Sequence, residues 1–238
     1  MKKSIKILFS LLMIFAFTQC KDDMTELNTN PELLTSTNPV FVFTSATQNW
    51  NNNSRGHLMG KYSGVMSLMQ YVVSNGGGVE GIYASTDKQS NPAPYLPYYN
   101  DYFSNYGNKL KYLIDVVIET RIDKDRYQNL TAIAKILQTY EAWLVFDTHG
   151  AAPFKEGLRA LEAINTPKYD LLEDLYKEFD TTLKEQVALL LSNPANQADL
   201  GKNDFFYRGD VSKWIKFGNT LRIKIAQRFE KVDNAHFQ

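Results

Sequence analysis

Apolar residues recur at spacings of three and four along most of the chain, and this period predicts helices. The regularity is strongest in five segments of the sequence: 58–73, 98–118, 126–147, 170–191 and 211–230. A sixth segment, 40–53, has a weaker pattern, but Asn38-Pro39 before it suits a helix start because proline is favoured in the first turn. We therefore predict six helices after the first forty residues.

Strands are not indicated by the pattern, because no run of alternating apolar and polar residues is long enough for a sheet. The segments 81–83 and 205–207 would form a small hairpin at most. Helices of roughly 15–22 residues that begin about every 40 residues are typical of paired helices. The sequence thus predicts an all-α fold with tetratricopeptide-like (TPR-like) packing of paired helices.

Several of the predicted helix ends carry capping residues. Asp210 is a suitable N-cap for the last helix, and Asp170 with Glu173 three residues later forms a capping-box-like pair. Gly150 and Pro153 end the helix before them, since neither residue continues a helix well. These signals predict that the helices begin directly after Asp170 and Asp210.

Two long connections separate the helices. Residues 75–97 contain Gly76-Gly77-Gly78 and Pro92-Ala93-Pro94, which cannot sustain a helix. Residues 151–168 form the second connection. Connections of this length in compact domains are usually functional or disordered. We therefore place candidate functional residues there first.

The first twenty residues have a different pattern. Three lysines within the first six residues precede residues 7–17, which are almost wholly apolar. A run of about eleven residues is too short to span a bilayer as a helix, which needs about 20. A charged start followed by such a run is typical of a secretory signal peptide. We predict a signal peptide over residues 1–19.

Charge argues against a nucleic-acid-binding function. Removing residues 1–19 takes away three lysines and no acidic residue, so the net formal charge falls from zero to about −3 over the remaining 219 residues. Such a chain is long enough for one domain with a sizeable core, and it has no broad attraction for nucleic acid or anionic lipid. The last helix is locally basic, with Lys213, Lys216, Arg222, Lys224, Arg228 and Lys231. We interpret this face as solvated or as a surface that pairs with acidic residues of a further C-terminal half. A contact with a partner protein is the remaining option.

Cys20 is the only cysteine, so it cannot form an internal disulfide. It resembles the lipid acceptor of a bacterial lipoprotein signal, and Lys21-Asp22-Asp23 resembles the tag that directs lipoproteins of the Bacteroidetes to the outer face of the outer membrane. Two or more acyl chains anchor a protein stably. We predict a lipidated tether and extended arm over residues 20–38 and a helical domain over 39–238. The alternative is an ordinary signal peptide that keeps its cysteine.

Five blocks of sequence, in order along the chain, resemble the SusD/RagB family, particularly its SusD-like lipoprotein branch. They are Cys20-Lys21-Asp22-Asp23 with 27–31, Tyr98-Tyr99-Asn100-Asp101-Tyr102 with 108–110, 132–140 with Asp147-Thr148-His149-Gly150-Ala151-Ala152-Pro153-Phe154, Pro167-Lys168-Tyr169-Asp170, and 209–214 with 221–228.

This resemblance implies a lipid-anchored protein of the outer membrane that faces the cell exterior. It implies a protein that binds a glycan or another nutrient and delivers it to a partner, a TonB-dependent SusC-like outer-membrane transporter. It implies neither enzyme activity nor a cofactor. Family members are commonly much longer, and the chain resembles their N-terminal half. The alternative is a cell-surface TPR-like module that binds protein and no glycan.

Aromatic residues are the candidate ligand contacts. Tyrosine suits a sugar because it combines a flat apolar ring with a hydrogen-bonding tip. The candidates lie off the helical stripes, either in or directly after the first long connection or among asparagines: Tyr83, Tyr95, Tyr98 and Trp50. By contrast, Tyr99, Phe103 and Tyr106 follow a helical spacing, and we predict that they fill the core. Trp143 and Trp214 lie within helices and are predicted to pack there.

Metal binding has little support in the sequence. His57, His149 and His236 are far apart, and no cysteine is free for a structural zinc site. Asp147 and Asp170 flank the second connection, but calcium normally needs six to eight oxygen ligands. We predict that Asp147 instead stabilises the turn at Gly150.

Catalysis has equally little support. Glu173, Asp174 and Glu178 are close together, but they lie in the first turns of a helix, where the dipole favours acidic residues. The chain contains no nucleophile elbow, no His-Glu-x-x-His motif and no phosphate-binding loop. We predict no catalytic residue.

Overall fold

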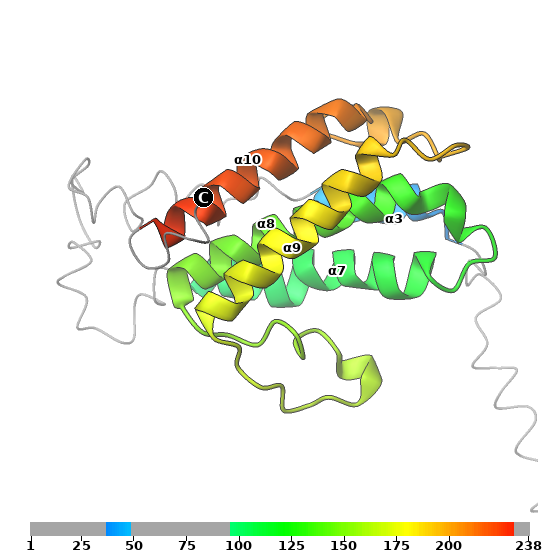
Figure 1. The fold of residues 1–238 in the computed structure, drawn as a ribbon. Coiled ribbons are helices and arrows are strands. Elements are labelled where there is room, and N and C mark those ends of the chain that lie inside the picture. The colour runs from blue at the N-terminus through cyan, green and yellow to red at the C-terminus, as the bar shows by residue number, and fades with distance from the viewer. Residues whose placement is uncertain (1–36, 49–95, 231–238) are drawn as a thin grey trace, which may run out of the picture. The chain divides into compact units, whose positions relative to one another are not determined.

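The computed structural model describes residues 37–48 and 96–230 (Figure 1). Within these ranges the α-helices are α3 (Pro39–Thr47), α6 (Leu96–Asp101), α7 (Gly107–Tyr112), α8 (Gln128–His149), α9 (Leu172–Leu191) and α10 (Val211–Phe229). The described residues form no strand, and a single β-bridge joins Ala152 to Asp170. The prediction of an all-α fold is confirmed for this part of the chain. The predicted signal peptide, the tether with Cys20 and the helix over 58–73 lie outside it.

Residues 96–118 form one continuous helical segment in which two π-helical stretches, η1 (Tyr102–Tyr106) and η2 (Leu113–Ile118), follow α6 and α7. In a π turn an N–H bonds the carbonyl five residues back, as Gly107 does to Tyr102. The extra residue shifts which side chains point inward. The buried positions are Tyr102, Tyr106, Leu110, Leu113 and Ile118. Tyr99 and Phe103, which were predicted to fill the core, are only partly buried.

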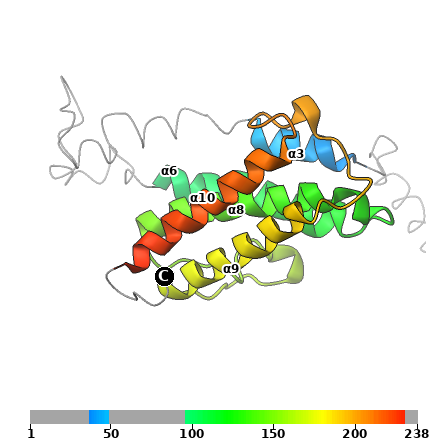
Figure 2. The same cartoon turned by 45° about the horizontal axis from the view of Figure 1, so that its top comes forward.

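Successive long helices run in opposite directions, from the segment 96–118 through α8 and α9 to α10 (Figures 1 and 2). α8 contacts the segment 96–118, α9 and α10, and α9 also packs along α10. The approach of α10 to α9 depends on Gly218, because a Cβ there would lie 2.7 Å from Cγ2 of Val187. Trp143 and Trp214 are buried between these helices, as predicted.

Two predicted helix starts are confirmed. Asn38 accepts a hydrogen bond from the Val40 N–H at 3.0 Å, and Pro39 occupies the first turn of α3. Asp210 caps α10, and its Oδ1 accepts from the N–H groups of Ser212 and Lys213. Each side chain satisfies N–H groups that have no partner within the first turn of a helix.

The predicted N-cap at Asp170 is wrong. α9 begins at Leu172 after Leu171, and no side chain caps it. Asp170 Oδ2 instead accepts from the backbone N–H of Phe154 at 2.8 Å and of Lys155 at 2.9 Å. Its own N–H donates to the Ala152 carbonyl at 3.1 Å. The carboxylate therefore closes the base of the connection between α8 and α9, where N–H groups far away in sequence need an acceptor.

The predicted role of Asp147 is also wrong. Its Oδ1 accepts from the Tyr176 hydroxyl and from Nε of Arg228 at 2.9 Å, so the side chain links α8 to α9 and α10. Gly150 forms the turn without it, because glycine adopts the required φ of 79° freely and its N–H bonds the Phe146 carbonyl.

The basic residues of α10 find partners within the same group of helices. Arg222 pairs with Asp180 of α9 at 2.7 Å, and Arg228 pairs with Asp147. The ammonium of Lys224 lies 5.8 Å from the ring centre of Trp143. The two arginines therefore pair with acidic residues of α9 and α8, and the interpretation that they pair with acidic residues of a further C-terminal half is wrong for them. Lys231 lies outside the described residues.

The connection between α9 and α10 folds around Asp204, which is fully buried. Oδ1 accepts from the N–H groups of Phe206 and Tyr207, and Oδ2 accepts from the Gly209 N–H and from Nε1 of Trp214 at 2.8 Å. This turn replaces the small hairpin considered for 205–207. It ties the connection to the first turn of α10.

Candidate ligand-binding site

Four aromatic side chains meet at the C-terminal end of α8, and we refer to them as the aromatic cluster: Tyr99, Phe103, His149 and Tyr169. The ring centres of Tyr99 and Phe103 are 4.5 Å apart, and those of Tyr99 and His149 are 5.5 Å apart. Tyr169 lies close enough to Tyr99 for its phenol to raise the pKa of the Tyr99 phenol. Tyr169 is 67% exposed, so the cluster presents aromatic surface to solvent.

Three parts of the fold bring the cluster together. Tyr99 and Phe103 come from the start of the segment 96–118, and His149 is the last residue of α8. Tyr169 directly precedes Asp170, whose bridge to Ala152 returns the connection to the end of α8. The hydrogen bonds of Asp170 therefore position Tyr169 beside Tyr99.

Both phenols of the cluster can donate a hydrogen bond at neutral pH, because a tyrosine is normally protonated there. Burial and then the neighbouring phenol of Tyr169 raise the pKa of Tyr99. Tyr99 therefore keeps its proton to a higher pH than an exposed tyrosine. Apolar ring faces beside phenolic hydroxyls suit a ligand that has apolar faces and polar edges.

The structure shows no contact for the four ligand contacts that were predicted from the sequence, because their side chains lie outside its described part. Tyr98 belongs to α6 and is the neighbour of Tyr99, but its side chain lies outside the described part of the structure. Tyr83, Tyr95 and Trp50 lie outside the described residues as well. These four assignments therefore stay predictions.

Sequence reasoning missed the two exposed members of the cluster. Tyr169 lies in the Pro-Lys-Tyr-Asp block at the end of the second connection, and that position outside any helical stripe was the available signal. His149 was considered only as a metal ligand. Tyr99 was predicted to fill the core, and it does pack against the core while its phenol reaches Tyr169.

The acidic residues that the sequence analysis considered for metal binding or catalysis form hydrogen bonds and ion pairs within the described part of the chain. In this part of the chain no three His, Cys, Asp or Glu side chains are grouped to hold a metal ion. The carboxylates of Asp147 and Asp170 already accept hydrogen bonds. At the start of α9, Glu173 pairs with Lys177 at 2.8 Å and Glu178 with Lys155 at 3.4 Å.

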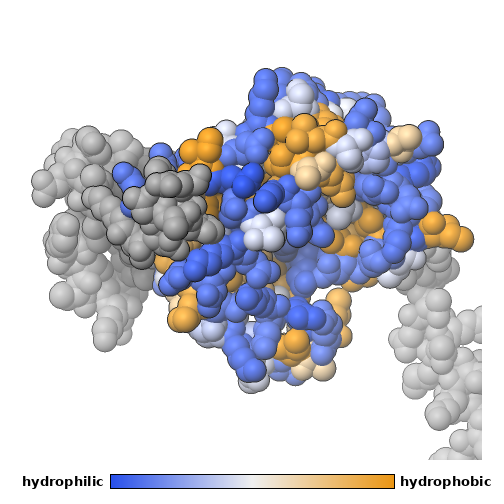
Figure 3. All heavy atoms as spheres, viewed as in Figure 1, coloured by the Kyte–Doolittle hydropathy of each residue, from blue (hydrophilic) through white to orange (hydrophobic). Residues whose placement is uncertain are grey.

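None of the described helices is both long enough and apolar enough to cross a bilayer. On the face seen in Figure 1, hydrophobic residues form separate patches among hydrophilic ones (Figure 3).

Comparison with known proteins places these features in context. A SusD-like family model, described as "starch-binding associating with outer membrane", matches residues 31–238. No curated protein sequence matches the chain. The fold is similar to that of a chitin-binding protein, with a TM-score of 0.64 and 22% identity over 84% of this chain and 41% of that one.

Two further solved structures have the same fold. A SusD homologue from Parabacteroides distasonis matches with a TM-score of 0.63 and 24% identity, over 84% of this chain and 37% of that one. A SusD/RagB family protein from Bacteroides thetaiotaomicron matches with a TM-score of 0.57 and 20% identity, over 82% and 39%. The chain thus spans about two fifths of the length of these structures. They are helical TPR-like proteins, so the predicted paired-helix architecture is confirmed.

Proposed function

The chain belongs to the SusD-like family, and on that premise we propose that it is a glycan-binding lipoprotein of the outer membrane that passes its ligand to a TonB-dependent transporter. The family is one of binding proteins and is not an enzyme class. The observation that carries the proposal of glycan binding is the aromatic cluster with its exposed Tyr169. No catalytic step is part of the proposal.

The chemistry of the cluster supports a sugar as ligand. A sugar ring has apolar C–H faces that pack on an aromatic face, and its hydroxyl groups need polar partners. The exposed ring of Tyr169 offers the face, and the neighbouring hydroxyl groups of Tyr169 and Tyr99 offer the polar partners. We propose that Tyr98, Tyr95 and Tyr83 contact the same ligand, because Tyr98 is the neighbour of Tyr99 in α6 and the other two precede this helix in the chain. Trp50 is a further proposed contact.

Replacing Tyr169 by alanine is expected to weaken glycan binding at least about tenfold, or about 1.4 kcal/mol, because an exposed aromatic anchor is lost. Isothermal titration of the full chain with soluble starch and with solubilised chitin measures this loss. Phe41→Ala is the matched control, since Phe41 is 61% exposed on α3 outside the cluster.

Equal affinities for the wild type and Tyr169→Ala would remove the cluster from the binding site. Binding of neither polysaccharide by the wild type would favour the alternative function, a protein-interaction module. Tyr98→Ala and Tyr95→Ala, measured in the same way, test the remaining predicted contacts.

Delivery to a transporter requires the anchor and the partner. We propose that Cys20 carries the lipid, since several acyl chains contribute about 0.8 kcal/mol per buried CH₂ and together hold a protein stably. The Cys20→Ala variant is therefore expected to leave the membrane fraction, whereas the wild type stays in it. A TonB-dependent barrel is expected to copurify with the wild type from solubilised outer membrane. Lipidated protein that captures no barrel would contradict the delivery step.

A further inference from the structure

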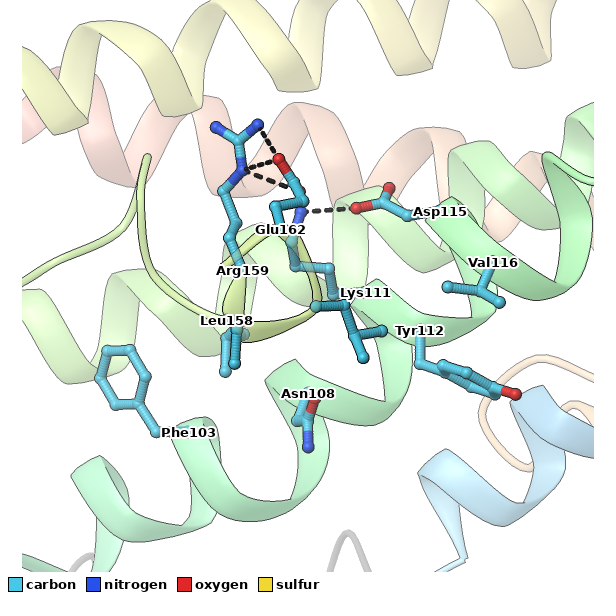
Figure 4. A pocket seen from close by; sticks show the side chains of 11 residues that line it. Phe103, Asn108, Lys111, Tyr112, Asp115, Val116, Leu158, Arg159 and Glu162 are labelled. Atoms are coloured by element: carbon cyan, nitrogen blue, oxygen red, sulfur yellow. Dashed lines mark hydrogen bonds and ion pairs between the residues drawn. The ribbon is translucent and has the colours of Figure 1, made fainter. Parts of the chain in front are cut away.

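A pocket of about 360 Å³ opens between the segment 96–118 and the connection that joins α8 to α9 (Figure 4). This volume lies in the range of about 300–1,000 Å³ that is usual for small-molecule sites. Phe103, Val116 and Leu158 give the pocket an apolar lining. Tyr112, which is 49% exposed, lines it together with Asn108. One face of a helix and one loop therefore form a hollow of the size of a small ligand.

Two ion pairs line the same pocket. Lys111 pairs with Asp115 at 2.5 Å on the helix, and Arg159 pairs with Glu162 on the connection. The Arg159 guanidinium, and to a smaller degree Lys111, lowers the pKa of Glu162, while the charge of Asp115 contributes to the raised pKa of Arg159. The four charges therefore act on one another across the pocket.

This arrangement of charges favours an uncharged ligand. The two positive and two negative groups cancel, so neither an anion nor a cation gains a net attraction. A charged ligand would also have to compete with an existing partner. An uncharged ligand with hydroxyl groups instead finds carboxylate acceptors and guanidinium or ammonium donors beside an apolar lining.

The loop side of the pocket has an unusual backbone. Leu158 and Ala163 adopt φ values of 60° and 62°, and they enclose the turn that carries Arg159 and Glu162. Non-glycine residues in this conformation are uncommon, and they concentrate at ligand clamps and other functional sites. The Leu158 side chain packs against the core, which holds the turn over the pocket.

We propose that this pocket is a second glycan subsite that binds one neutral sugar unit, with the ring against Tyr112 and the apolar lining and the hydroxyl groups on the two ion pairs. The subsite rests on the proposed glycan-binding function. It adjoins the aromatic cluster through Phe103. The ring centre of Phe103 lies 4.5 Å from that of Tyr99, and Phe103 also lines the pocket. An oligosaccharide on the cluster would then extend into the pocket.

The test uses the full chain labelled with 3-fluorotyrosine and titrated with maltotriose and with tri-N-acetylchitotriose. The Tyr112→Phe variant assigns the Tyr112 fluorine resonance, which is expected to shift saturably with at least one of the two trisaccharides. Asn108→Trp places an indole in the pocket and is expected to weaken the affinity read at Tyr112 at least about tenfold. Ile223→Trp is the matched control, because it places the same indole at a position of α10 that is 62% exposed and does not line the pocket, and its affinity is expected to stay within about twofold of the wild type.

The outcomes separate the subsite from the proposed function. If the wild type binds glycan but the Tyr112 resonance does not move, or if Asn108→Trp and Ile223→Trp bind equally well, the subsite is wrong and the function stands. If the wild type binds neither these trisaccharides nor starch nor chitin, both are wrong. A shift at Tyr112 that persists in Tyr169→Ala and is lost in Asn108→Trp would establish the pocket as a separate subsite.

Discussion

Replacing Asp204 by alanine is expected to lower the free energy of unfolding by about 4 kcal/mol, because four N–H donors lose a buried acceptor. The carboxylate is fully buried, and its two oxygens accept from three backbone N–H groups and from the indole of Trp214. No water can replace these bonds without opening the turn between α9 and α10. Urea denaturation followed by circular dichroism measures the loss.

Two further variants show whether burial of the carboxylate is the cause. Asp199→Ala removes a carboxylate from the same connection, where it accepts one exposed bond from the Gly201 N–H, and we expect a loss below about 1 kcal/mol. Asp204→Asn keeps the shape but turns an NH₂ group toward N–H donors, so we expect an intermediate loss. If Asp204→Ala and Asp199→Ala have the same stability, the buried carboxylate does not organise this turn.

Phe179→Ala is expected to cost about 3–5 kcal/mol, the range for removing a large aromatic side chain from a core. Phe179 of α9 is fully buried, and its ring centre lies 5.0 Å from that of Phe154 and 6.0 Å from that of Phe146. It thus joins α9 to α8 and also supports the connection between them. The same denaturation measurement gives the loss of stability.

The Phe179→Ala variant should also loosen the base of that connection. Phe154 donates its N–H to Asp170, and Tyr169 of the aromatic cluster is the neighbour of Asp170. Hydrogen exchange at the N–H of Phe154 should therefore become faster, and glycan affinity should fall. Ile223→Ala is the control on α10, where Ile223 is 62% exposed, and it should change stability by less than about 0.5 kcal/mol. Unchanged exchange at Phe154 would contradict the link between core and site.

The helices could be predicted because the spacing of apolar residues within a short stretch of sequence indicates a helix. The periodic apolar positions of α8, α9 and α10 lie on one stretch of sequence each, and side chains such as Asn38 and Asp210 cap the turn that follows them. The π-helical stretches η1 and η2 were not predicted, because the apolar spacing of residues 98–118 also fits an ordinary α-helix. Tyr102 is buried there, while Phe103 lies at the pocket.

The candidate site was predictable only in kind. Sequence alone predicted that tyrosines contact a sugar, and one of them, Tyr98, is the neighbour of Tyr99 of the aromatic cluster. It did not indicate Tyr169, which reaches Tyr99 from seventy residues further along the chain because Asp170 closes the connection on Ala152. Nor did it indicate the pocket between Tyr112 and Arg159, whose two sides come from separate parts of the fold.

By itself the sequence determined the helical class, the boundaries of α8, α9 and α10 to within about two residues and the family, because these depend on patterns within short stretches. The helix predicted over 40–53 ends earlier, at Thr47. Only the tertiary structure decided what the acidic side chains do. Asp147, Asp170 and Asp204 look in sequence like turn or cap residues, yet each accepts hydrogen bonds that its own place in the chain does not predict. A carboxylate binds whichever donors the fold brings within reach, and residues distant in sequence become neighbours only when the helices pack.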